Sequence, residues 1–337
     1  MPRFQGLHKE FGIMTMMLGQ WMESEIREQP AVLANGAKRY FSELEALKGR
    51  KYDMVLLAAR GSSDNAALYA RYLIEVFLQV PVSLAAPSVL TRFGRQVKYT
   101  NCLAVGISQS GAAPDVAEVL ASLRQEGHTT LAITNTEGSR ITVEAEHTLL
   151  LDAGIEKSVA ATKTYSSSLL ALYELVRALG GNLPYPQDLL PCSDWVDFSA
   201  EAAQAASGSV VRNSPVFSLG RGFGFSTAQE SALKLMECAL IPCKAYSSAD
   251  FEHGPKALAG HGSAAICFDG PKPDLAAQGC EILEAPKPPM SRSGDVEGIL
   301  SPIWDIFFGQ WLALTCARAR GLNPDDPRHI QKVTKTL

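Results

Sequence analysis

The N-terminal part of the chain places apolar side chains at helical spacing rather than in continuous runs. Between residues 13 and 48 they recur every three or four positions: Met14, Met17, Leu18, Trp21, Met22 and Ile26. This period predicts amphipathic helices. The step Gln29-Pro30 predicts a break between two of them, because proline lacks the N–H of a helical hydrogen bond. We therefore expect an N-terminal helical arm over residues 1–48.

From residue 49 onward, short apolar runs alternate with longer amphipathic stretches. The runs cover residues 52–59, 80–86, 102–107, 129–134 and 147–151, and helices are expected near 64–78 and 114–126. Short apolar strands separated by helices are typical of a parallel, doubly wound sheet that is covered on both faces. The pattern predicts an α/β domain over residues 49–182.

A second unit of the same kind follows a proline-rich segment. The sequence LPYPQDLLPCSDW breaks the periodicity, so we expect a linker over residues 183–207. Beyond it, VFSLGRGFG resembles the earlier VLLAARGSS, with Arg221 placed 161 residues after Arg60; the same offset carries Cys102 to Ser263. A repeated strand-to-turn junction predicts a second α/β domain over 208–325, followed by a tail over 326–337.

Composition and charge narrow the function classes. The chain has 337 residues, 46% of them hydrophobic, with 31 basic and 35 acidic residues and no basic block. This disfavours nucleic-acid binding. The seven cysteines form no C-x-x-C pair, and no apolar stretch is long enough to span a membrane. We expect a cytoplasmic protein with reduced thiols, without a membrane segment.

Three turns in the first α/β domain have the composition of an anion site. Their polar side chains are Ser62 and Ser63 in the first turn, Ser108, Gln109 and Ser110 in the second, and Thr162, Lys163 and Thr164 in the third. The first two follow predicted strands and precede helices, where backbone N–H groups and the helix dipole favour a negative charge. One such turn is usually only a helix N-cap, but three in one domain favour a ligand.

The same turns limit what the ligand can be. The sequence contains no G-x-x-x-x-G-K-[ST] motif and no strand-borne G-x-G-x-x-G motif, which disfavours nucleoside triphosphates and dinucleotides. We expect a compact phosphate monoester held by hydroxyls and backbone amides, with no metal and no cofactor.

The second half of the chain supplies titratable groups. Glu230, Lys234 and Glu237 follow one another at spacings of four and three, which places them on one helix face. A solvated salt-bridged stripe is the alternative reading. The helix is apolar nearly all round, so a carboxyl on it is expected to be partly buried, which raises its pKa toward the range of a general base. His253 follows in an E-H-G-P turn, and Lys332 lies in a polar tail of the kind that is usually frayed.

Taken in order, these motifs resemble one family. They are G-S-S at 61–63, S-Q-S-G at 108–111, V-A-A-T-K at 159–163, G-R-G at 220–222, E-S-A-L-K-L-M-E at 230–237, E-H-G-P at 252–255 and K-V-T-K-T-L at 332–337. The chain is similar over nearly its whole length to double sugar-isomerase (SIS) domain proteins. The resemblance implies two tandem flavodoxin-like SIS domains.

The resemblance also implies roles for individual residues. Ser63, Ser108, Gln109 and Ser110 would hold the phosphate of a sugar, and Val159 and Ala161 would line the sugar itself. Ser62, Thr162 and Lys234 complete the expected substrate-binding set.

Three further residues would do the chemistry. Glu237 would move a proton between C1 and C2, His253 would open the ring, and Lys332 would approach the carbonyl. In the family the histidine comes from the partner subunit, which implies a homodimer. An enediol route needs such a carboxylate, an acid and an amine.

The sequence departs from the family at three positions. Ala113 stands where relatives carry a hydroxyl, and Met236 stands where lysine is common. Ala161 stands where a related enzyme of the family, glucosamine-6-phosphate synthase, has serine. Pro2 follows Met1 where that synthase begins its glutamine-hydrolysing domain with cysteine, so we expect no internal ammonia source.

These features lead to a preferred function and its alternatives. Without a nitrogen donor we expect an isomerising glucosamine-6-phosphate deaminase that yields fructose 6-phosphate and ammonia. An aldose/ketose phosphosugar isomerase or a fructosamine-phosphate deglycase would use the same chemistry. A non-catalytic phosphosugar sensor is the alternative from another class, although the first 50 residues do not resemble a DNA-binding domain.

Overall fold

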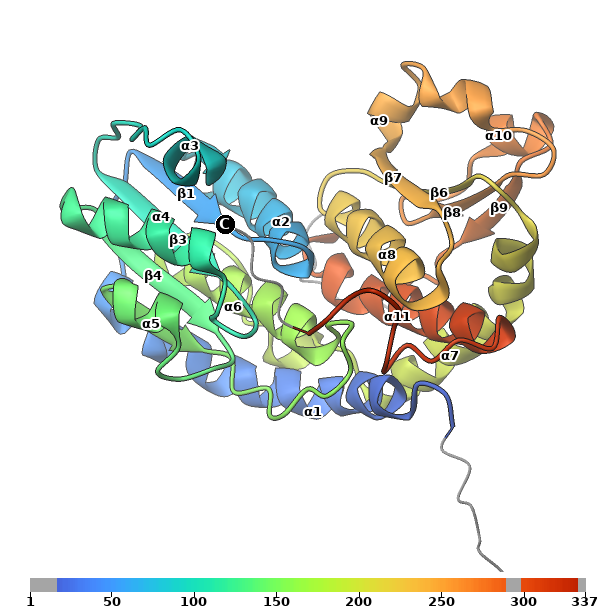
Figure 1. Cartoon of the computed structure of the whole chain (residues 1–337), viewed down its shortest axis with the longest axis horizontal. Coiled ribbons are helices and arrows are strands. Elements are labelled where there is room, and N and C mark those ends of the chain that lie inside the picture. Colours follow the sequence, from blue (N-terminus) through green and yellow to red (C-terminus); the bar gives the residue numbers. More distant parts are fainter. Residues whose placement is uncertain (1–16, 289–297, 333–337) are drawn as a thin grey trace, which may run out of the picture.

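The chain folds around two parallel β-sheets, each with helices packed on it (Figure 1). The computed structural model describes residues 17–288 and 298–332. Within these residues the first sheet contains five strands and the second contains four, and every strand pair is parallel. Two tandem α/β domains were expected, and the structure confirms them.

The first sheet has the strand order β2-β1-β3-β4-β5, which is the flavodoxin-like order. Its strands are β1 (Met54–Ala58), β2 (Val82–Leu84), β3 (Cys102–Ile107), β4 (Thr129–Thr134) and β5 (His147–Leu150). The helices of this domain are α2 (Ser62–Phe77), α3 (Ser88–Thr91), α4 (Pro114–Gln125), α5 (Arg140–Glu144) and α6 (Lys163–Ala178). The strand predictions at 102–107 and 129–134 are confirmed: β3 is buried along its whole length, and β4 is buried from its second residue onward.

The second sheet repeats the first four strands, in the order β7-β6-β8-β9. Its strands are β6 (Val216–Gly220), β7 (Cys243–Ser247), β8 (Ala264–Cys267) and β9 (Glu281–Glu284), and its helices are α8 (Gly224–Ala239), α9 (Ser248–Phe251) and α10 (Pro273–Ala277). The starts of β1 and β6 lie 162 residues apart, as do those of β3 and β8. The helix after β8 is much shorter than its counterpart α4, so the second copy is reduced.

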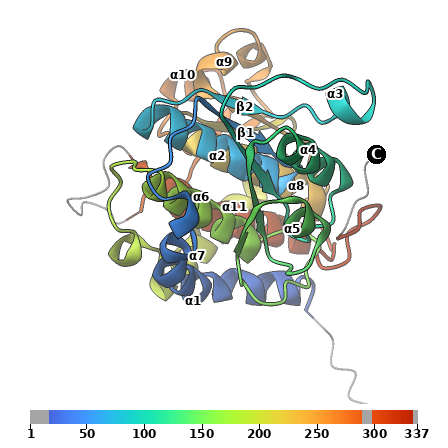
Figure 2. The same cartoon turned by 90° about the vertical axis from the view of Figure 1, so that its left-hand side faces the viewer.

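Long helices join the two domains. The buried helix α6 packs against α1 (Gln20–Glu43), α2 and α11 (Ser301–Ala319), and α11 in turn packs against α8 and α7 (Ser193–Arg212). Helix α11 is buried on all sides, which its nearly uniform apolar sequence requires. Helix α1 runs along the base of the molecule beneath α6 and α7 (Figures 1 and 2).

Two predictions about the helices are wrong. The break at Gln29-Pro30 is absent, because α1 continues through Pro30. Proline cannot donate to the Ile26 carbonyl, but the Gln29 side chain donates to it instead, with Nε2 to O at 3.2 Å. Helix α1 is also part of the packed body rather than an arm, while residues 1–16 lie outside the described part of the chain.

The linker expected over 183–207 is wrong in its second half. Its last proline is Pro191, and α7 starts two residues later at Ser193 and buries Trp195 and Val196. Of the expected tail over 326–337, residues 326–332 are described. None of the described helices combines the length and apolar character needed to cross a membrane.

Candidate active site

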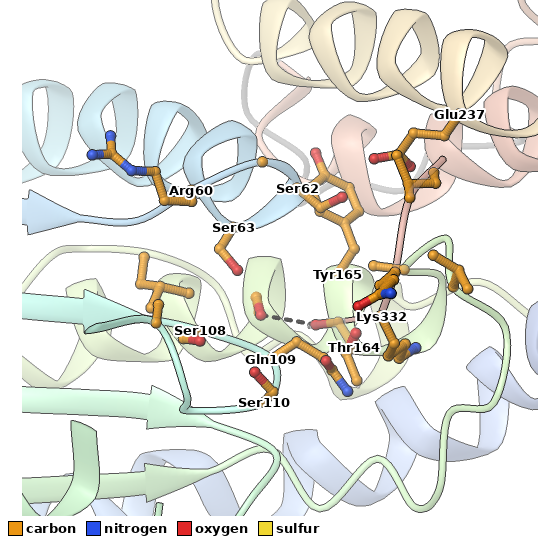
Figure 3. A pocket seen from close by; sticks show the side chains of 18 of the residues that line it. Arg60, Ser62, Ser63, Ser108, Gln109, Ser110, Thr164, Tyr165, Glu237 and Lys332 are labelled. Carbon is orange, nitrogen blue, oxygen red and sulfur yellow. Dashed lines mark hydrogen bonds between the residues drawn. The ribbon is translucent and has the colours of Figure 1, made fainter. Parts of the chain in front are cut away.

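A polar cavity of about 360 Å³ lies at the carboxyl ends of β1 and β3, where open parallel sheets bind their ligands. Figure 3 shows the serine-rich turns on one side of it and Glu237 and Lys332 on the other. Predicted site residues that line it are Ser62, Ser63, Ser108, Gln109, Ser110, Val159, Ala161, Lys234, Glu237 and Lys332. The fold therefore brings together groups that are up to 270 residues apart in sequence, as Ser62 and Lys332 are.

The first turn places the start of α2 against the cavity. Gly61 has a positive φ of 56°, and Ser62 begins a helix of 16 residues. The N-terminal end of such a helix carries partial positive charge and favours an anion. The Arg60 guanidinium points away from the serines and binds Asp115, with Nε to Oδ2 at 2.7 Å (Figure 3). This ion pair joins the first turn to the start of α4.

The second turn runs from Ser108 to Ala113 and ends at Pro114, the first residue of α4. Within residues 17–288 and 298–332, no hydrogen bond uses the main-chain N–H of Gln109 or Ser110. Gly111 has a φ of 64°, and a Cβ there would lie 1.9 Å from the Ser139 hydroxyl oxygen. Glycine thus allows the turn to pack closely while its hydroxyls and amides face the cavity.

Replacing Ser110 by alanine is expected to raise KM and leave kcat nearly unchanged. The hydroxyl lies in the serine-rich turn, on the side of the cavity away from Glu237 (Figure 3), so it would bind ground state and transition state alike. Steady-state kinetics on a phosphorylated amino sugar measure both constants. A large isolated fall in kcat would contradict a purely binding role.

Of the three residues predicted in the third turn, only Thr164 lines the cavity. Thr162 is fully buried, and its N–H donates to Glu156 at 3.0 Å. Lys163 forms an ion pair with Glu28 instead, with Nζ to Oε2 at 2.5 Å. Tyr165 and Ser168 also line the cavity; both were missed, since the apolar helix that follows gives no sign of which side chains face a ligand.

Helix α8 brings three charged side chains together. Lys234 Nζ lies 2.5 Å from Glu237 Oε2 and 3.3 Å from Glu230 Oε1, so the predicted common face is confirmed. Lys234 also donates to the Ser62 hydroxyl at 3.2 Å, and Asn65 donates to Glu230 at 2.7 Å. These bonds tie α8 of the second domain to α2 of the first.

The two carboxylates of this face have different environments. The Glu230 side chain is fully buried, and burial raises its pKa above the ordinary value although Lys234 and Asn65 oppose the shift. Glu237 lines the cavity with 27% of its side chain exposed. Burial alone would lower the pKa of Lys234, but the two carboxylates outweigh it and raise that pKa well above its ordinary value. Lys234 is therefore a fixed cation beside Glu237.

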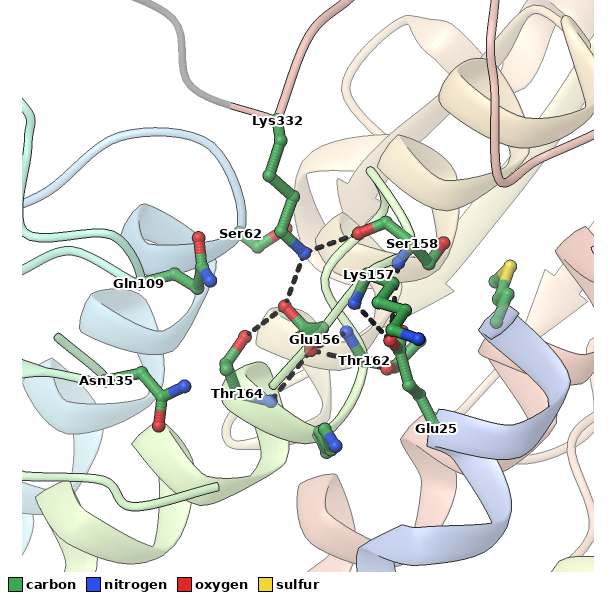
Figure 4. A network of polar contacts seen from close by, with 12 residues as sticks. Glu25, Ser62, Gln109, Asn135, Glu156, Lys157, Ser158, Thr162, Thr164 and Lys332 are labelled. Carbon is green, nitrogen blue, oxygen red and sulfur yellow. Dashed lines mark hydrogen bonds and ion pairs between the residues drawn. The ribbon is translucent and has the colours of Figure 1, made fainter. Parts of the chain in front are cut away.

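The tail lysine is anchored rather than frayed (Figure 4). Lys332 Nζ forms an ion pair with Glu156 Oε2 at 2.9 Å and also donates to the Ser158 carbonyl. Glu156 has a fully buried side chain and was not singled out in the sequence. The structure thus gives Lys332 an anionic partner inside the protein body.

Glu25 of α1 lies behind this pair. Its carboxylate accepts the N–H groups of Lys157 and Ser158, the latter at 3.3 Å. Burial, together with the neighbouring Glu156, raises the pKa of Glu25 to about 7. Helix α1 thus holds the loop that carries both partners of Lys332.

This shift predicts a pH-dependent stability. Between the ordinary pKa of 4.5 and the folded value of about 7, the native chain keeps a proton on Glu25 that the unfolded chain has released. The contribution is fully present below pH 4.5 and is lost as pH rises toward 7. We expect Glu25→Gln to reduce the fall in unfolding free energy across this window, measured by urea titration. Glu43→Gln at the end of the same helix is the control; an equal effect there would refute the assignment.

His253 is the predicted catalytic residue that the fold keeps outside this cavity. It is exposed in the turn between α9 and the short helix Pro255–Leu258, and it belongs to the second domain. A single chain therefore supplies no acid from this residue to its own cavity. In the described part of the chain, no group of three or more His, Cys, Asp or Glu side chains has the arrangement of a metal site.

Several known proteins are similar to this chain in sequence and in fold. The SIS domain family matches residues 50–178. The chain is 30% identical to glutamine–fructose-6-phosphate aminotransferase [isomerizing] of Methanothermobacter thermautotrophicus, covering 93% of the chain and 57% of that protein. The protein of the same name from Symbiobacterium thermophilum is 31% identical, with 93% and 58% covered. The chain thus spans less than two thirds of these relatives.

A solved structure covers the whole length more evenly. Glucosamine-6-phosphate deaminase from Thermotoga maritima superposes with a TM-score of 0.78 at 25% identity, over 94% of this chain and all of that one. The likeness covers both sheets and the helices that join them.

Proposed function

We propose that this chain, whose residues 50–178 match the SIS domain family, is a phosphosugar-processing enzyme that converts glucosamine 6-phosphate and water into fructose 6-phosphate and ammonia. One observation carries the proposal. A single cavity combines a hydroxyl-rich anion cradle with a carboxylate beside a fixed cation and a tail amine. The names of two similar proteins contain the two sugars of this reaction: fructose 6-phosphate in the isomerising aminotransferase and glucosamine 6-phosphate in the deaminase.

The cradle would hold the phosphate. Ser63, Ser108 and Ser110 offer hydroxyls, and the N–H groups at the start of α2 and in the second turn add neutral donors. Such donors bind a phosphate monoester without a metal ion. Bound there, the sugar chain would extend toward Glu237 and Lys332 on the opposite wall (Figure 3).

Glu237 would move the proton. In the open-chain amino sugar it takes the C2 proton while the C1 carbonyl gains one, which gives an enaminol. Returning the proton to C1 gives an imine at C2, and water then replaces the nitrogen to release ammonia and the ketose. Lys234 orients the Glu237 carboxylate, because their side-chain atoms lie 2.5 Å apart.

Two groups would act on the carbonyl end. Lys332 lines the cavity and can polarise the C1 carbonyl or form an imine with it. Ring opening needs an acid, and we assign it to His253 of a second subunit, because the residue is exposed and does not line the cavity of its own chain. The proposed enzyme is therefore a homodimer.

The decisive assay supplies glucosamine 6-phosphate and quantifies ammonium and fructose 6-phosphate separately. We expect both products in equal amounts. Ketose formed from plain hexose phosphates, with no ammonium from the amino sugar, would replace deamination by aldose/ketose isomerisation. Release of a sugar from a fructosamine phosphate alone would indicate a deglycase, and saturable binding without turnover of any substrate would indicate a sensor.

A further inference from the structure

The ammonium of Lys332 is bound by two acceptor oxygens, one from a carboxylate and one from a main-chain carbonyl. Its Nζ lies 2.9 Å from Glu156 Oε2 and donates to the carbonyl of Ser158 (Figure 4). The Lys332 side chain keeps 25% of its surface exposed and lines the cavity, whereas the Glu156 side chain is fully buried. A carboxylate oxygen and a carbonyl oxygen together favour a cation over a phosphate, although the Thr164 hydroxyl shares Glu156 Oε2 at 2.8 Å.

This site is built independently of Lys332. Glu156 accepts the N–H of Thr162 at 3.0 Å, the N–H of Thr164 at 3.1 Å and the Thr164 hydroxyl at 2.8 Å. These bonds fix the carboxylate against the first turn of α6. The backbone next to the Ser158 carbonyl is fixed in turn, because the Glu25 carboxylate accepts the N–H groups of Lys157 and of Ser158 itself. Removing the lysine would thus leave a preformed site.

We propose that Glu156 and the Ser158 carbonyl are the subsite for the substrate's amino group, and that Lys332 occupies it until an amino sugar binds. This rests on the proposed function, since it presumes that a phosphorylated sugar enters the cavity. The site adjoins Thr164 and Lys332, which line the cavity opposite the serine-rich turns. A 2-ammonium group would satisfy the same two acceptors that Lys332 satisfies now.

The arrangement would select amino sugars and couple their binding to the tail. A sugar ammonium exchanges one cation for another, whereas a 2-hydroxyl would have to displace the lysine and leave Glu156 without its charge partner. The displaced Lys332 is then free to reach the carbonyl carbon. Competition from the lysine also weakens the substrate's apparent affinity, because binding requires its release.

The test uses two unreactive open-chain probes, 2-amino-2-deoxyglucitol 6-phosphate and glucitol 6-phosphate, with affinities measured by calorimetry on the whole protein. We expect the amino probe to bind at least ~10-fold more tightly, the low end for a hydrogen bond to a charged group. Glu156→Gln should abolish that preference. Glu28→Gln is the matched control, because Glu28 pairs with Lys163 beside the same loop and lies outside the cavity.

A second variant keeps the proposal testable if Glu156→Gln fails to fold. Lys332→Met removes the competing ammonium near the chain end, so it should tighten binding of the amino probe. An equal affinity for both probes in the wild type, or an unchanged preference in Glu156→Gln, overturns the subsite alone. If neither probe binds, the phosphosugar site itself is wrong and the proposed function falls with it.

Discussion

Glu237→Gln is expected to lower kcat by at least ~100-fold, the lower end of general-base contributions, with little change in KM. The amide keeps the size of the side chain and one acceptor for Lys234, but it cannot take a proton. Lys234 Nζ lies 2.5 Å from Glu237 Oε2, so the geometry of the pair should survive the substitution. Steady-state ammonium release measures the loss.

Two measurements separate a base from a merely structural residue. Substrate deuterated at C2 should transfer the label to C1 or lose it to water in the wild type, and the variant should do neither at a comparable rate. Glu230→Gln is the comparison on the same helix, because Glu230 binds Lys234 and Asn65 and does not line the cavity. An active Glu237→Gln variant would transfer the role of base to another group.

Most strands of the two sheets could be predicted from local sequence, whereas features that depend on distant contacts could not. The bounds of β3 and β4 were predictable, because β3 is a continuous apolar run and β4 consists only of β-branched and apolar residues that are buried after the first. The continuity of α1 was not, because it depends on the Gln29 side chain replacing the bond that Pro30 cannot make. Helix α7 was missed because proline-rich sequence directly precedes it.

In the candidate site, too, some residues were predictable from local sequence and others depend on distant contacts. The serine-rich turns were predictable because strand-to-helix junctions place them at one edge of the sheet. The role of Glu156 was not predictable, since a single carboxylate in a loop gives no sign of its partner Lys332, which lies 176 residues later in the chain. Glu25 gave no signal either, because its raised pKa results from burial beside Glu156.

Deleting residues 330–337 is expected to abolish turnover while the fold and its stability are retained. Ile330, Gln331 and Lys332 form one wall of the cavity, so the deletion removes the lid together with the amine. Residues 333–337 lie outside the described part of the chain, and the argument depends on the three residues before them.

The fold should survive because the tail is anchored upstream of the cut. Asn323 accepts the N–H of Gly19 at 2.9 Å, and Asp325 accepts those of Trp21 and Met22 at 2.8 and 2.9 Å. These bonds satisfy the otherwise unpaired amides at the start of α1 and do not involve the deleted residues. Circular dichroism and a thermal melt check that the shortened chain is folded.

Point variants then separate the roles of the lid and the amine. Lys332→Arg keeps the charge but cannot form an imine, so retained turnover would assign an electrostatic role and lost turnover a covalent one. Lys332→Met removes both and should match the deletion in kcat, because a lid without its amine has nothing to present to the carbonyl. If the shortened protein releases ammonium at the wild-type rate, neither the lid nor Lys332 takes part in the reaction, and the ion pair with Glu156 serves only to hold the tail.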